Sequence, residues 1–278
     1  MTELKRIFIV MLTLFLAGCG AKFMYNNMDW LVLEFVDDYV TLTNDQESIV
    51  ESRLQSLVKW HRESELPIYI ERIEALRNMK REEIDQSFIL AQRKEIKQHI
   101  KKVVSEVAPD IYALASQATR KQEQEFIENF TENQSEYLEK YLGLSDAETR
   151  ELYRDKIKSG LNKWLGSITP KQQVIVNEWS QSMEITTLGW RAYQSRILST
   201  LNQLFEKKSD THYFQQTLMA LLLEPESFYS DELANQIETN MNLSSEFMVL
   251  ILSTTTDKQW AHFQNELLEL QQLAEGLI

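Results

Sequence analysis

Apolar residues recur along the chain at the spacing of an α-helix rather than at the alternation of a β-strand. Trp30, Leu33 and Val36 are three residues apart, which places them on one face of a helix. Ile96 and Ile100 continue the same three- and four-residue spacing in a later segment. This pattern predicts an all-α protein built from amphipathic helices, in which Trp30 contributes to the core.

Four short motifs predict where helices begin. A hydroxyl residue followed three positions later by Gln or Glu forms a capping box, in which each side chain bonds the backbone N–H of the other residue. The four boxes start at Thr43, Ser145, Thr169 and Thr256, and their partners are Gln46, Glu148, Gln172 and Gln259. The boxes are unevenly separated along the chain, which argues against a solenoid repeat.

Glycine and proline are scarce, with 7 and 4 residues, so few turns and long helices are expected. Pro109 is predicted to open a helix, because proline suits the first helical turn, and Gly143 to end one. Pro225 predicts a hinge or loop near residues 223–231. We therefore expect roughly eight to ten helices, packed as a multi-helix bundle or curved helical array in a single domain over residues 19–278.

The first 18 residues have the features of a secretory signal peptide. Lys5 and Arg6 precede an apolar run from Ile7 to Leu16, which is too short to cross a bilayer. Leu16-Ala17-Gly18-Cys19 follows and resembles the bacterial lipobox. This resemblance implies cleavage before Cys19, diacylglycerol on its thiol and an acyl group such as palmitate on its new amino group.

Other features near Cys19 agree with a lipid anchor. Cys19 is the one cysteine of the chain, so lipidation explains a residue that could form no internal disulfide. Two or three acyl chains on one residue hold a protein stably at a membrane. Gly20 stands where an aspartate would favour retention at the inner membrane, which favours the outer membrane, facing the periplasm. Phe23 and Tyr25 are close enough to the anchor to contact lipid.

The chain carries 42 acidic and 29 basic residues, a formal charge of −13. A strongly acidic surface argues against nucleic acid, whose phosphates favour basic proteins, and against adsorption to anionic lipid. We therefore expect membrane attachment through the lipid alone, together with a protein partner or client in the envelope.

Several motifs near the N-terminus carry a family resemblance. They are Tyr25-Asn26-Asn27-Met28-Asp29-Trp30-Leu31, Asp37-Asp38-Tyr39-Val40, Leu42-Thr43 with Gln46, Trp60-His61-Arg62, and Glu65-Leu66-Pro67 with Tyr69. In this order they resemble an uncharacterised family of proteobacterial lipoproteins, a domain of unknown function. The resemblance implies an envelope lipoprotein and carries no activity with it.

A second resemblance rests on one element. Leu42-Thr43 with Gln46, echoed by Ile168-Thr169 with Gln172, is similar to a motif of the Spy and CpxP periplasmic chaperones. That similarity implies a helical protein that holds unfolded clients. This chain differs in being much longer and strongly acidic, whereas the cradle of those chaperones is typically basic.

The sequence offers one group of residues that could carry chemistry: Asp37, Asp38, His61, Arg62 and Glu65. One interpretation is structural, with the aspartates capping a helix or pairing with Arg62 across a helical hairpin. The alternative is a hydrolase or lyase in which His61 acts as a base beside these carboxylates. We favour the structural interpretation, since ion pairs also bring such residues together.

No motif for a metal or cofactor accompanies that group. The histidines lack His-x-x-x-His spacing and the glycines do not cluster into a phosphate loop, so no metal or cofactor is expected. The sequence as a whole predicts a lipid-anchored envelope protein with a non-enzymatic binding, scaffolding or chaperone-like role.

Overall fold

The computed structural model describes residues 18–278, and residues 1–17 lie outside the described part. The side chains of residues 18–21 and 136–139 lie outside it as well. The predicted signal peptide and the lipidated thiol of Cys19 therefore fall outside the described residues.

The all-α prediction is confirmed: residues 18–278 form helices joined by short connections and contain no strand. The helices, which outnumber the eight to ten expected, are α2 (Gly18–Asn26), α3 (Met28–Asp37), α4 (Asn44–Ser64), α5 (Leu66–Asn78), η2 (Arg81–Glu83), α6 (Gln86–Gln117), α7 (Arg120–Leu142), α8 (Asp146–Leu165), α9 (Pro170–Ser182), α10 (Thr187–Glu206), α11 (Thr211–Leu223), η3 (Pro225–Phe228), α12 (Asp231–Ser253) and α13 (Asp257–Glu275).

All four predicted helix starts are confirmed. Each of the four boxes makes both of its reciprocal bonds and begins α4, α8, α9 or α13. A fifth box, Thr119 with Gln122, begins α7 and was missed in the sequence. Gly143 follows the last residue of α7, as predicted. The connection between α11 and α12 contains the single-turn helix η3, and hinge motion at this connection stays a prediction.

The prediction that Pro109 opens a helix is wrong, because Pro109 lies inside α6. An internal proline costs a helix about 3 kcal/mol through a lost hydrogen bond and a clash. Contacts along α6 offset that cost, since α4, α11 and α12 all pack against it. Ala108, next to the proline, is buried.

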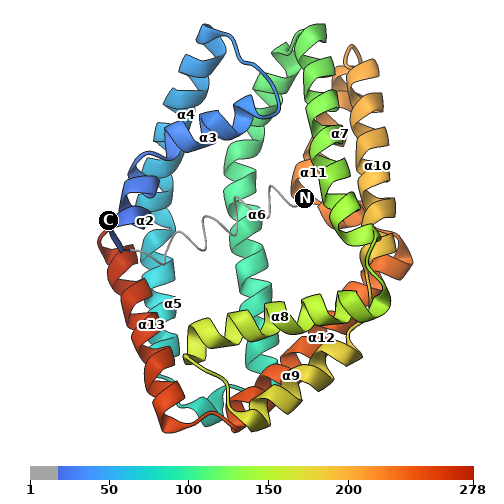
Figure 1. The fold of residues 1–278 in the computed structure, drawn as a ribbon. Helices are drawn as coiled ribbons and strands as arrows, with labels where there is room; N and C mark the ends of the chain where they lie inside the picture. The colour runs from blue at the N-terminus through green and yellow to red at the C-terminus, as the bar shows by residue number, and fades with distance from the viewer. Residues whose placement is uncertain (1–17) are drawn as a thin grey trace.

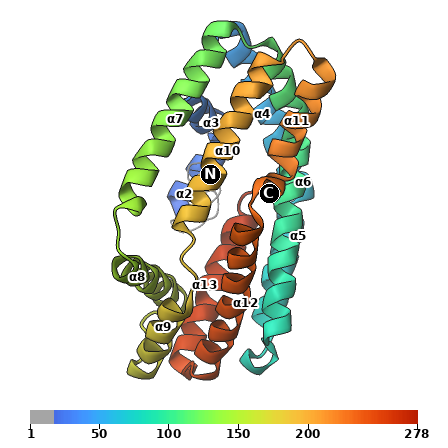
Figure 2. The same cartoon turned by 90° about the vertical axis from the view of Figure 1, so that its right-hand side faces the viewer.

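The helices form an open frame (Figure 1). The helices α4, α5 and α13 line one side, α7, α10 and α11 line the other, and α6 runs between them. Across the lower end lie α8, α9 and α12, and the view turned by 90° shows them gathered with α13 (Figure 2). One core cluster joins α8, α9, α12 and α13, and a second joins α6, α7, α10 and α11.

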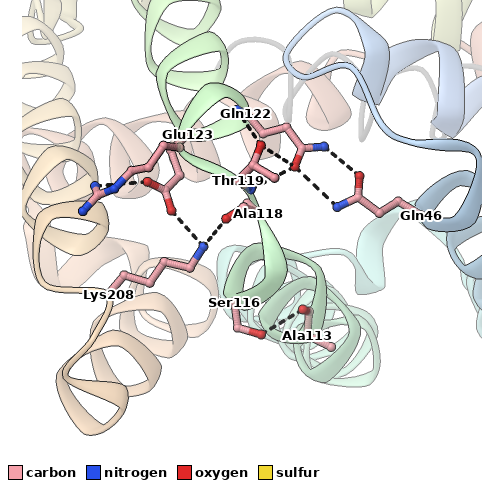
Figure 3. A network of polar contacts seen from close by, with 9 residues as sticks. Gln46, Ala113, Ser116, Ala118, Thr119, Gln122, Glu123 and Lys208 are labelled. Atoms are coloured by element: carbon pink, nitrogen blue, oxygen red, sulfur yellow. Dashed lines mark hydrogen bonds and ion pairs between the residues drawn. The ribbon is translucent and has the colours of Figure 1, made fainter.

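Two capping boxes far apart in the sequence join at the start of α4 and α7 (Figure 3). The Nε2 of Gln122 donates to Oε1 of Gln46 over 2.7 Å, and Nε2 of Gln46 approaches Oε1 of Gln122 at 3.5 Å. Gln122 Nε2 also donates to the carbonyl of Thr41, two residues before the threonine of the first box, at 3.0 Å. We call this reciprocal pair of glutamines the first clasp.

The same arrangement recurs at the start of α9 and α13. Gln259 Nε2 donates to Gln172 Oε1 at 2.8 Å, and Gln172 Nε2 donates to Gln259 Oε1 at 3.2 Å. Gln259 Nε2 also donates to the carbonyl of Ser167 at 2.7 Å. Ser167 again stands two residues before the threonine of the first box, Thr169. This second clasp therefore repeats the first bond for bond.

A further pair of contacts shows that the repeat is a two-fold one. Lys208, just after α10, donates to the carbonyl of Ala118, the residue before the second box of the first clasp, at 2.5 Å. Arg81, just after α5, donates to the carbonyl of Thr255, the residue before the second box of the second clasp, at 2.9 Å. Each cation thus reaches across to the other half of the chain.

The packing of the long helices follows the same symmetry. The first half contains α4–α7 and the second contains α9–α13, and the last helix of each packs on the second helix of the other: α7 on α10, and α13 on α5. Such mutual contacts are those of an isologous dimer, here within one chain. The halves differ in that α11 and η3 follow Lys208, whereas only the three-residue η2 begins at Arg81.

Breaking the second clasp should destabilise the whole frame. Gln172 is fully buried, and Gln172→Ala removes both bonds to Gln259 together with the bond that Gln172 accepts from the backbone N–H of Thr169. A hydrogen bond contributes about 0.5–1.5 kcal/mol, so we expect a loss near 2 kcal/mol in the free energy of unfolding. Urea titration checks this, with Gln173→Ala as the control, because the half-buried neighbour Gln173 bonds Asn177 of its own helix and takes no part in the clasp. Equal stability of the two variants would contradict a role for the clasp.

Candidate functional site

The structure brings together three of the five residues singled out in the sequence. His61 and Arg62 lie in the last turn of α4, and Glu65 joins α4 to α5. Asp37 and Asp38 are exposed at the end of α3 and, among the described residues, make no ion pair with Arg62. The predicted pairing is therefore wrong.

The reason is the direction of α3 and the segment after it. The chain beyond α3 runs to α7, where Asn129 donates to the carbonyl of Tyr39 at 3.1 Å and Thr41 donates to Glu125 at 2.5 Å. These bonds hold the end of α3 beside α7, away from His61.

Glu65 is a fully buried carboxylate with two basic partners from α6. His99 Nδ1 lies 3.0 Å from its Oε2, and Lys102 Nζ pairs with its Oε1. Burial pushes the pKa of Glu65 upward, but hydrogen bonds from Lys102 and His99 and their charges lower it below its usual range. Sequence reasoning missed both partners, although their three-residue spacing places them on one face of a helix.

His61 lies next to this buried cluster, between Tyr25 of α2 and Tyr69 of α5. The Tyr25 hydroxyl lies 2.9 Å from His61 Nδ1, and the Tyr69 ring packs between His61 and His99, with ring centres 5.5 and 5.4 Å away. Burial lowers the pKa of His61, while Glu65 acts in the opposite direction. At neutral pH a neutral imidazole can accept a hydrogen bond from the Tyr25 hydroxyl at Nδ1, which suits a structural contact.

These residues attach α2 to the body of the protein. Arg62 Nη2 donates to Asn26 Oδ1 at 3.3 Å, and its guanidinium lies 5.6 Å from the centre of the Tyr25 ring. Together with the Tyr25–His61 bond, these contacts bind the helix that begins next to Cys19. The arrangement can therefore position a membrane anchor relative to the helical frame.

The exposed aromatic residues near the anchor differ in part from the prediction. Trp30 is 57% exposed, so its assignment to the core is wrong; α3 packs on α4 with another of its faces. Phe23 is 62% exposed and Tyr25 is half-buried. The outer face of α2 and α3 thus carries Phe23 and Trp30 near Cys19, with the exposed Glu34 farther along.

A separate apolar groove of about 450 Å³ opens between α8, α12 and α13. Its walls include Leu161 and Trp164 from α8, Met248 from α12 and Phe263 from α13. The remaining lining residues are Leu76, Lys156, Ile157, Gly160, Leu165, Trp179, Ile251, Leu252 and Leu267. Apart from Lys156, every lining residue is apolar, aromatic or glycine, so the groove suits an apolar ligand.

None of the five residues from the sequence lines this groove or the smaller hollow beside Arg81 and Trp260. Within the described part of the chain, no cluster of His, Cys, Asp and Glu has the arrangement of a metal site. In residues 18–278, no helix is long and apolar enough to cross a membrane.

Removing the buried carboxylate should give a pH-dependent loss of stability. Glu65→Gln removes the charge that His99 and Lys102 contact, and we expect a loss of roughly 2 kcal/mol at neutral pH. Because folding lowers the pKa of Glu65, its contribution is complete above the unfolded value near 4.5 and disappears as the pH falls through the lower folded value. Urea unfolding should therefore show wild type and variant converging in acid.

The exposed neighbour Glu63 provides a matched control. Its one ion pair among the described residues is a surface contact with Lys59 at 4.0 Å, and such exposed pairs contribute little to stability. Glu63→Gln should have little effect at any pH. A Glu65→Gln protein as stable as wild type at neutral pH would refute the structural role of the buried cluster.

Comparison with known proteins gives a family. No curated protein matches the chain, and no solved structure matches it. The similarity to the Spy and CpxP chaperones therefore stays a prediction. The model of a family of unknown function, DUF6279, matches residues 38–234, which is most of the chain and confirms the expected membership of an uncharacterised family. The chain belongs to DUF6279.

Proposed function

We propose that this protein is a lipid-anchored envelope lipoprotein, attached through Cys19, whose helical frame binds another envelope protein without catalysing a reaction. The observation that carries the binding role is the apolar groove between α8, α12 and α13. Soluble proteins rarely leave a contiguous apolar surface in contact with water, and such a surface often marks a site where a ligand or another protein binds.

The anchor half of the proposal has its own support. The lipobox-like Leu16-Ala17-Gly18-Cys19 is followed by the exposed Phe23 and Trp30, four and eleven residues after Cys19, and tryptophan favours the membrane interface. Glu34 is exposed farther along on α3 and would be repelled by anionic lipid, so the exposed aromatic side chains come before this exposed carboxylate in the chain. That order suits a helix that leaves a membrane surface and faces the periplasm of an outer membrane.

The geometry supports the alternative, a hydrolase or lyase, less well. Such an enzyme would use Asp37, Asp38 and Glu65 around His61. Glu65 is occupied by His99 and Lys102, and the two aspartates lie at the far end of α3. A binding role, by contrast, requires no catalytic group, and the apolar groove is sufficient for it.

Replacing the anchoring residue should abolish lipidation. Cys19→Ser removes the thiol to which lipid would be joined, so the protein should accumulate as uncut precursor in the membrane or as soluble protein. Metabolic labelling with a fatty acid and detergent phase partition measure this. Wild-type labelling and partition in the Cys19→Ser variant would refute the lipoprotein proposal.

Filling the groove should weaken binding of an apolar probe. Gly160 lines the groove, and a Cβ added there would meet no atom within 4 Å, so Gly160→Leu places the rest of its side chain in the space of the groove. We expect residues 20–278 with this change to bind the dye anilinonaphthalene sulfonate roughly tenfold more weakly, since overfilling a site costs about 1–3 kcal/mol.

Gly160→Ala is the matched control, because it removes the same helical glycine and leaves the groove open. It should retain dye binding and gain about 0.5–1 kcal/mol of stability. Equal dye binding by the two variants would show that the groove is not the apolar site.

A further inference from the structure

We infer that the occupant of the groove is the apolar face of an amphipathic α-helix from a partner protein. The inference rests on the proposed function and deepens it by naming the kind of segment that binds. The two-fold repeat carries the argument, because it allows the groove to be compared with the matching place in the other half of the same chain.

The capping boxes set the register of that comparison. Thr119 of α7 corresponds to Thr256 of α13, and the backbone bond from Ala118 to the carbonyl of Ala115 recurs between Thr255 and Leu252. This register places three groove residues opposite three residues of the first half. Leu252, Phe263 and Leu267 correspond to Ala115, Phe126 and Phe130.

In the first half those three positions are half-buried and pack against α10 and α11. Ala115, Phe126 and Phe130 pack in one cluster with the buried side chains of α10 and α11, whose members include Phe214 and Leu218. Phe214 and Leu218 are four residues apart, so α11 presents them from one face. The apolar surface of the first half is therefore completed by α11, a helix of the second half.

In the second half the covering helix is missing. The counterpart of α10 is α5, which contributes Leu76 to the groove, but the counterpart of α11 is replaced by η2. As a result Leu252 and Phe263 stay partly exposed beside α5 and α8, next to the buried Leu267. A helix supplied by another protein would complete the surface in the manner of α11.

The dimensions and chemistry of the groove agree with this occupant. A volume of about 450 Å³ accommodates a few side chains from one helical face rather than a whole helix. Binding of an amphipathic helix by its apolar residues in such a groove is a common mode of peptide recognition. The nearly all-apolar lining offers little to the backbone of an extended peptide, which needs hydrogen bonds along its length.

The probe for the experiment can be taken from the chain itself. A peptide of residues 211–223, Thr211 to Leu223, extended by a soluble polar tail, carries the Phe214 and Leu218 spacing. Its control has the same composition with the apolar residues reordered so that they share no helical face. Both are titrated into protein of residues 20–278 with fluorescence anisotropy and circular dichroism as readouts.

We expect the helical peptide to bind with one-to-one stoichiometry, to gain helicity, and to bind at least about tenfold more tightly than the reordered control. Gly160→Leu should weaken its binding and Gly160→Ala should not. Equal binding of the two peptides would overturn the inference in favour of an unfolded segment. Displacement of the dye by palmitate but not by peptide would overturn it in favour of a lipid.

Self-association of the protein, measured by sedimentation, with loss of dye binding as the concentration rises would overturn it in favour of a second copy. Each of these outcomes leaves the dye comparison of Gly160→Leu with Gly160→Ala intact. Failure of that comparison, by contrast, would remove the groove as a binding site altogether.

Discussion

The reciprocal hydrogen bonds between two pairs of glutamines determine how this chain closes into a frame. A primary amide has one acceptor oxygen and two donor hydrogens, so two facing amides satisfy each other and retain a donor for a backbone carbonyl. Gln122 and Gln259 use that remaining donor on Thr41 and Ser167. Each clasp thus fixes two helix starts and the segment before one of them, although they are far apart in the sequence.

The two-fold repeat then explains why the molecule is open. Each half gives its last helix to the other half, so the long helices lie along the two sides and α6 alone runs between them (Figure 1). The apolar residues consequently divide between two clusters, one at each end. Only one cluster has a helix like α11 to complete it, and the asymmetry leaves an apolar groove at the other.

Features that depend on neighbouring residues, such as helix starts, were predicted correctly from the sequence. Features that depend on contacts between distant segments, such as burial and ion pairing, were not. The capping boxes at Thr43, Ser145, Thr169 and Thr256 need only four consecutive residues, and all four are present in the structure. The fifth, at Thr119, has the same Thr-x-Lys-Gln string as Thr169 and Thr256, so the sequence contained the signal for it. Reading it would have revealed the second member of the first clasp.

The errors have a common cause. Burial of Glu65 depends on His99 and Lys102, which lie in another helix, and charged residues are rarely buried unless they are paired. Pro109 is tolerated because three helices pack along α6, and Trp30 is exposed because α3 uses another face. The sequence did not predict the groove either, because its walls come from five helices that only the fold brings together.

The helix α13 connects the two parts of the proposed function. It packs on α2, the anchor helix, and its residues Phe263 and Leu267 line the groove. These residues precede the end of α13 by two to three turns, and a helix rises about 5.4 Å per turn. With lipid on Cys19, the groove would therefore stand on the order of 10–20 Å from the anchor helix along α13. Anchoring through Cys19 and binding in the groove would then be joined through one helix, since α13 contacts α2 and also forms a wall of the groove.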